Sequence, residues 1–88
     1  MKFEIITPSG SEVTLDDIHS VRTELSDGKP LTILPRHAPL MGEISNTSIT
    51  ATTADHVSNS YAVKPGVLVV MDDVIKILTS GLQEGVSA

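Results

Sequence analysis

Hydrophobic and polar residues alternate over short stretches of this chain, and turn-forming residues separate the stretches. Val21, Thr23 and Leu25, for example, would share one face of a strand while Arg22 and Glu24 take the other. The i, i+3, i+4, i+7 spacing of an amphipathic helix is never sustained. The pattern therefore predicts an all-β protein of about eight to ten short strands, the clearest of them over 3–7, 12–15, 21–25, 31–34, 48–53, 61–63, 67–71 and 74–79.

The final hairpin is the most apolar part of the chain. Strands over 67–71 and 74–79 are joined by Asp72 and Asp73, and both carry apolar residues on both faces. This composition is typical of strands covered on two sides, and it predicts a hairpin central to a β-sandwich or flattened barrel. Residues 1–80 form one predicted domain, and the small, polar residues 81–88 are predicted to be a short C-terminal tail.

A proline-containing segment, residues 33–40, is the most distinctive part of the first half. Pro35 and Pro39 each lack a backbone N–H donor and have a fixed φ, so the segment is neither helix interior nor central strand. We therefore predict a rigid loop, called the proline loop below, that presents Arg36 and His37 in a fixed place. It is either a surface for a partner or only a stiff connection between two strands, and the residues alone leave both interpretations open.

Charge and composition restrict the possible partners. The 88 residues include six basic and eleven acidic ones, and a formal charge of −5 leaves no basic face for nucleic acid. The longest apolar run, 67–71, is far shorter than the roughly 20 residues that span a bilayer, and the N-terminus does not resemble a signal peptide. The chain has no cysteine, so disulfides are excluded. We expect a cytoplasmic protein without direct membrane insertion.

Patterns for catalysis or metal binding are missing from the sequence. Neighbouring carboxylates such as those of Asp16 and Asp17 would point to opposite sides of an extended chain, unlike an acid–base pair. No nucleophile elbow or glycine-rich phosphate loop is present. We predict a non-catalytic protein with no cofactor and no metal site, since its histidines are far apart and lack carboxylates at ligand spacing: His19, His37 and His56.

Together with its neighbours, the proline loop resembles the hallmark of the epsilon subunit of F-type ATP synthases, called delta in mitochondria. The resemblance covers almost the whole chain, because it includes the opening strand that ends at 7–10, the Asp27-Gly28 turn, residues 61–66 and the closing strand at 74–78. It implies a ten-stranded antiparallel β-sandwich, a flattened barrel.

Three features depart from the usual pattern of that family. Lys29 stands where an acidic residue is common, in a segment with about one extra residue. Arg36 replaces the glycine usually found before His37, so we expect no positive φ there. The helical hairpin that commonly follows the sandwich has no counterpart in the 88 residues. We expect a short form of the subunit that lacks nucleotide binding, with a truncated chain as the alternative.

The resemblance implies a non-catalytic rotor subunit of the central stalk that couples proton-driven rotation to ATP synthesis. It would be a monomer when isolated, one copy in a hetero-oligomeric complex, and peripheral to the cytoplasmic side of the plasma membrane. Carried over from the family's loop, the residues expected to face the gamma subunit are His37, Pro39, Leu40 and Met41. Those expected to face the c-ring are Asp27, Gly28, Lys29 and Pro30, with Arg36 at their margin.

Other interpretations remain open at this point. A stand-alone β-sandwich adaptor or carbohydrate-binding module has a similar composition, but sugar-binding faces usually offer stacking rings and the chain has only Phe3 and Tyr61. An enzyme of unknown type is a third class. Several expected interface residues also have a purely structural interpretation, with Leu40 in the core, Asp27 and Gly28 as a plain turn, and Lys29 as a solvated charge.

Overall fold

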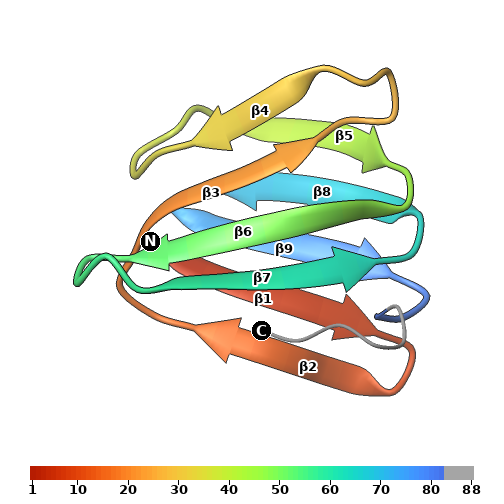
Figure 1. Cartoon of the computed structure of the whole chain (residues 1–88), viewed down its shortest axis with the longest axis horizontal. Helices are drawn as coiled ribbons and strands as arrows, with labels where there is room; N and C mark the ends of the chain where they lie inside the picture. The colour runs from red at the N-terminus through yellow and green to blue at the C-terminus, as the bar shows by residue number, and fades with distance from the viewer. Residues whose placement is uncertain (83–88) are drawn as a thin grey trace.

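The computed structural model describes residues 1–82, which form two packed β-sheets (Figure 1). Within this range the nine strands are β1 (Lys2–Thr7), β2 (Gly10–Leu15), β3 (Ile18–Glu24), β4 (Pro30–Ile33), β5 (Leu40–Ile44), β6 (Thr47–Thr53), β7 (Ser58–Val63), β8 (Gly66–Met71) and β9 (Val74–Thr79). One sheet has the order β2-β1-β9-β8-β5 and the other β4-β3-β6-β7. The predicted all-β sandwich is confirmed, with nine strands described instead of ten.

The core lies between the two sheets and is built by the alternation seen in the sequence. In each strand every second side chain points inward, away from solvent. Full burial of a large aliphatic or aromatic side chain stabilises the fold by roughly 1.5–3 kcal/mol. The buried apolar residues are Phe3, Ile5, Ile18, Val21, Ile33, Ile44, Ile49, Ala51, Val63, Leu68, Val70, Ile75 and Ile77.

One strand pair corrects the antiparallel expectation. β1 and β9 run parallel, with Phe3 beside Ile75 and Ile5 beside Ile77. The reason is that β1 enters the sheet at the end where the β8–β9 turn starts β9, and the Lys2 N–H donates to the Asp73 carbonyl at 3.1 Å. The five-stranded sheet is therefore mixed, since its other pairs are antiparallel.

Strand β7 begins earlier than the pattern predicted. The sequence pattern predicted a strand over 61–63, but β7 already starts at Ser58. The hydroxyl of Ser58 lies 3.0 Å from that of Thr52, and the Ser60 hydroxyl lies 2.9 Å from that of Thr50. Because each hydroxyl has a partner on the adjacent strand, a polar sequence forms a regular ladder there.

The predicted tail is only partly within the described range, because residues 83–88 lie outside it. Gly81 and Leu82 are attached to β7: the Lys64 N–H donates to the Gly81 carbonyl at 3.0 Å, and Leu82 pairs with Val63. None of the elements in residues 1–82 is a helix with the length and hydropathy needed to cross a membrane.

The sandwich has two ends, about 20 Å apart for strands of six residues. The end that we call the loop end holds the chain start, the proline loop and the turns β2–β3, β6–β7 and β8–β9 (Figure 1). The end that we call the tip end holds the turns β1–β2, β3–β4, β5–β6 and β7–β8. The turns of the loop end are acidic, since they contain Asp16, Asp17, Asp55, Asp72 and Asp73.

Candidate functional site

The proline loop begins with a tight turn of four residues, from Leu34 to His37. The His37 N–H donates to the Leu34 carbonyl at 3.2 Å, and Arg36 has a φ of 65°. Proline holds φ at about −65°, so Pro35 and Arg36 together have the signs of a type II β-turn, whose third residue is usually glycine. The expectation that Arg36 avoids a positive φ is therefore wrong.

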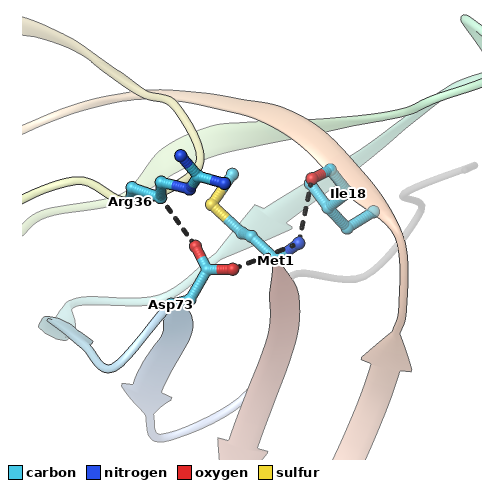
Figure 2. A network of polar contacts seen from close by, with 4 residues as sticks. All are labelled: Met1, Ile18, Arg36 and Asp73. Carbon is cyan, nitrogen blue, oxygen red and sulfur yellow. Dashed lines mark hydrogen bonds and ion pairs between the residues drawn. The ribbon is translucent and has the colours of Figure 1, made fainter.

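A carboxylate from a distant hairpin contacts this turn. The Arg36 N–H donates to Oδ1 of Asp73 at 2.9 Å (Figure 2). Asp73 lies in the β8–β9 turn, 37 residues further along the chain. The contact gives the outward-pointing N–H of the turn a charged acceptor, and such charge-assisted hydrogen bonds are stronger than neutral ones. No local sequence pattern signals it, because packing of the sheets brings the two turns together.

His37 and Pro39 are presented at the surface of the loop end. The His37 ring is half-buried, and its Nδ1–H donates to the Ala38 carbonyl at 2.7 Å, which fixes the ring against its own backbone. Pro39 is exposed. The loop therefore offers a preformed surface that combines an imidazole with a rigid apolar ring.

Leu40 and Met41, also expected at the gamma interface, lie on opposite faces of β5. Leu40 pairs with Val70 and packs against the core. Met41 is 72% exposed and pairs with Val69 on the outer face of the sheet. Of the four expected gamma-facing residues, His37, Pro39 and Met41 are therefore at or near the surface, while Leu40 has the structural role considered for it.

The outer face of the five-stranded sheet is apolar around Met41. Met71 is 55% exposed and Leu78 42%. The registers place Met71 beside Val74 and Leu78 beside Val67. We call this set the apolar outer face: Met41, Val67, Val69, Met71, Val74 and Leu78. Two exposed charged residues share the face with it, Lys76 beside Val69 and Glu43 beside Val67.

This surface was not predicted, although the apolar residues that form it were visible in the sequence. Apolar residues on both faces of the final hairpin were interpreted as burial on both sides. β8 and β9 are indeed central strands of their sheet, but the second sheet covers only one of their faces. Apolar residues on both faces of a strand also fit a strand whose second face is exposed and available to another protein.

The outer face of the four-stranded sheet has the opposite character. Hydroxyl pairs between β6 and β7 follow one another, Thr50 with Ser60 and Thr52 with Ser58. Arg22, Glu24 and Thr32 are exposed on the neighbouring strands. The two outer faces therefore differ in kind: that of the four-stranded sheet is polar, whereas that of the five-stranded sheet exposes apolar side chains alongside Lys76 and Glu43.

The residues expected at the c-ring lie at the tip end, in the β3–β4 turn and at Pro30, the first residue of β4. Gly28, with a φ of 85°, donates its N–H to the Leu25 carbonyl at 2.9 Å, and the Lys29 N–H donates to Oδ1 of Asp27 at 3.0 Å. The connection is thus longer than the two-residue turn suggested by Asp27 and Gly28. All four residues from Asp27 to Pro30 are exposed.

Arg36 does not share this surface. β4 runs from Pro30 at the tip end to Ile33, so Arg36 lies in the loop that follows, at the other end of the sandwich. Arg36 is therefore separated from the four residues at whose margin it was expected, and lies instead beside Asp73 of the β8–β9 turn.

No group of three or more His, Asp or Glu side chains within residues 1–82 is arranged to hold a metal ion. An open hollow of about 700 Å³ at the loop end is lined by several turn residues, among them Asp16, Asp17 and Asp55, whose side chains are exposed to solvent. The surface features described above are the proline loop, the apolar outer face and the exposed turn of the tip end.

Comparisons with known proteins identify relatives of this fold. A family model for the β-sandwich domain of the ATP synthase delta/epsilon chain matches residues 1–85. A chain in the cryo-EM structure of the central stalk and c-ring of the Tetrahymena thermophila mitochondrial ATP synthase has a TM-score of 0.75 at 15% identity, and the match covers 94% of this chain and 65% of that one. A comparison with curated protein sequences found no match.

A second solved structure is similar over nearly the whole sandwich. It is a chain in the OSCP/F1/c-ring structure of the Euglena gracilis mitochondrial ATP synthase, with a TM-score of 0.83 at 12% identity and coverage of 97% of this chain and 54% of that one. This chain therefore spans less than two thirds of both relatives, and identities this low compare the fold alone. The family model, in contrast, matches all but the last three of the 88 residues, and its β-sandwich is the fold observed. The chain belongs to the delta/epsilon family of ATP synthase subunits.

Proposed function

We propose that this chain is a non-catalytic rotor subunit in the central stalk of an ATP synthase. It docks on the gamma subunit and on the c-ring, so that proton-driven rotation of the ring is transmitted to the catalytic head. Family membership supports the assignment to the complex. The observation that carries the docking role is the exposed apolar outer face, which continues into the proline loop through Met41. Extended exposed apolar patches are typical of protein–protein interfaces.

The gamma-facing surface consists of His37, Pro39 and Met41, extended by Val69 and Met71 on β8. The two prolines fix the loop before binding, so little conformational entropy is lost when a partner docks. Methionine side chains adapt to an irregular apolar partner surface. Leu40 supports this surface from the core side, where it packs beneath the start of β5.

The c-ring-facing surface is the exposed turn from Asp27 to Pro30. It lies at the tip end, so the two partners contact different parts of one stiff body. An interface of standard size takes roughly 800 Å² from each partner. Two such interfaces fit on a chain with an accessible surface of 5148 Å². Arg36, by its place at the loop end, belongs with the gamma-facing residues.

The carbohydrate-binding alternative loses its chemical basis. Phe3 is fully buried, and its ring lies 6.2 Å from that of Tyr61, which is itself half-buried. These are the two aromatic residues of the chain. Neither ring provides the exposed stacking platform that sugar recognition normally uses.

Copurification tests the proposal directly. Membranes from the source cells are washed at low salt, and the released catalytic head is examined for this chain by mass spectrometry. We expect the chain to come away with the head together with gamma. Recovery of the chain only in fractions free of ATP synthase subunits contradicts the proposal.

A substitution at His37 then tests the loop as part of the interface. His37→Asp places a carboxylate in a desolvated contact while the core stays intact, and we expect the free energy of binding to gamma to weaken by more than about 1 kcal/mol. The melting temperature of the isolated chain should not change. His56→Asp is the matched control, because His56 is exposed at the same end but in the β6–β7 turn. Normal binding by His37→Asp would remove the loop from the interface.

A further inference from the structure

We propose that Asp73 is the positioning residue of the proline loop: its carboxylate selects the turn conformation in which His37 and Pro39 face the gamma subunit. The inference rests on the proposed function for the identity of the partner. The conformational part stands on contacts within this chain alone.

Asp73 connects three segments at the loop end (Figure 2). Its Oδ1 accepts the Arg36 N–H at 2.9 Å, and its Oδ2 lies 3.7 Å from the α-ammonium group of Met1. Its backbone carbonyl accepts the Lys2 N–H at 3.1 Å. The Met1 side chain is only 1% exposed, so its burial holds the ammonium group in place beside the Asp73 carboxylate. The carboxylate is therefore held on one side by the start of β1 while it holds the proline loop on the other.

The backbone at Asp73 indicates that its side chain is used. Asp72 and Asp73 have φ values of 53° and 62°, as in a type I′ turn between β8 and β9. Glycine is strongly preferred at the second central position of such a turn, because a left-handed conformation strains residues that carry a Cβ. This chain has an aspartate there, whose carboxylate makes a contact that glycine could not make.

The contact acts on the one peptide group that distinguishes two turn types. Type I and type II turns differ by a flip of their central peptide, which in this loop joins Pro35 to Arg36. A non-glycine residue such as Arg36 favours type I by itself, because only type II gives it a positive φ. The N–H of that peptide is the one bound by Asp73. Asp73 therefore selects the type II turn against the local preference, and the turn sets the direction in which the loop continues to His37.

The experiment compares Asp73→Gly with Asp72→Gly in the full chain. Both variants remove one negative charge and one left-handed side chain from the same turn, and glycine is compatible with both positions. Only Asp73→Gly removes the acceptor for Arg36. By NMR, the close approach of the Pro35 Hα to the Arg36 N–H reports the type II turn, and amide exchange reports the hydrogen bond.

We expect Asp73→Gly to lose the strong Pro35–Arg36 NOE, to exchange its Arg36 amide at least ten-fold faster, and to bind purified gamma about three- to ten-fold more weakly. Asp72→Gly should behave like the unmodified chain in all three measurements. Asp73→Asn keeps a carbonyl acceptor but loses the charge facing Met1, so it should retain the NOE. This rescue distinguishes the loop contact from the ion pair.

The outcomes separate this inference from the proposed function. An unchanged NOE and unchanged exchange in Asp73→Gly overturn it, whatever gamma does. Loss of the NOE with undiminished gamma binding shows that docking does not use this turn conformation, and also overturns it. If the unmodified chain does not bind gamma, the proposed function and the docking role of Asp73 fail together, while the NMR comparison still decides whether Asp73 selects the turn.

Discussion

Met41 of β5 lies directly opposite Val69 of β8 on the outer face of the five-stranded sheet. One residue earlier, Leu40 pairs with Val70 and faces the core. Of these two adjacent residues, Leu40 contributes to core packing and Met41 contributes to the exposed surface. Substitutions at Met41 can therefore test docking without a large effect on folding.

Met41→Asp should lower the affinity for gamma at least about ten-fold, because it buries a carboxylate in an apolar contact, and should shift the melting temperature little. Isothermal titration of gamma and thermal unfolding of the free chain measure the two effects. Ser60→Asp introduces the same charge on the outer face of the other sheet and should leave binding unchanged. Equal losses of affinity in both variants would point to net charge instead of to the apolar outer face.

Arg36→Gly should stabilise the isolated chain by about 0.5–1 kcal/mol, because glycine adopts the observed φ of 65° without steric strain. For a domain of this size the melting temperature should rise by about 2–8 °C. Arg36→Ala removes the same side chain but keeps the Cβ, so it should give no gain. A loss of stability in Arg36→Gly, measured by urea unfolding, would mean that contacts of the arginine side chain stabilise the fold by more than the strain of its positive φ destabilises it.

Thr23→Val should also stabilise the fold. Thr23 is 6% exposed, and its Oγ1 is buried without a hydrogen-bond partner among the described residues. An unsatisfied buried hydroxyl costs about 1–3 kcal/mol, and valine has nearly the same shape, so a gain of about 1 kcal/mol is expected. Thr32→Val, at an exposed position on β4, is the control and should change stability little. Chemical denaturation of both variants decides the point; lower stability of Thr23→Val would contradict the assignment.

Lys29→Glu tests the tip end. If the exposed turn meets the c-ring, reversal of this charge should weaken assembly with the ring about five-fold at low ionic strength, and the effect should disappear at high salt. Lys64→Glu makes the same change in the β7–β8 turn of the same end and separates a specific contact from a general charge effect. Unaltered assembly of Lys29→Glu at every salt concentration would leave Lys29 as a solvated residue.

Local patterns predicted most of the fold because most of it is local. Hairpins such as β8–β9 and β6–β7 join neighbours in sequence, and alternation marks their inward faces. The parallel pairing of Phe3 with Ile75 could not be predicted in this way, since it joins distant segments. The early start of β7 was missed for a different reason, because Ser58 has no intrinsic strand signal and gains its partner only from Thr52.

In the candidate site, too, features set by local sequence were predicted and features set by distant residues were not. Two prolines were sufficient to predict a rigid loop, since their constraint is covalent. The conformation of Arg36 was predicted wrongly because it depends on Asp73 in another hairpin. The place of Arg36 relative to Lys29 depended on the direction of β4, which short segments do not specify. The apolar outer face was visible in the sequence but had two interpretations, and only the sheet order decided between them.

The parallel pairing of β1 with β9 also determines when the five-stranded sheet can form during translation of the chain. β1 lies between β2 and β9, and β9 is the last of the described strands to leave the ribosome. Until β9 is made, the five-stranded sheet lacks its central strand. The edge of β8 that pairs with β9 is then unpaired, and β8 carries Val69 and Met71 of the apolar outer face. Domains rich in such non-local pairings form slowly and late. A chain that has been synthesised only as far as β8 therefore cannot form the complete apolar outer face, because Val74 and Leu78 belong to β9.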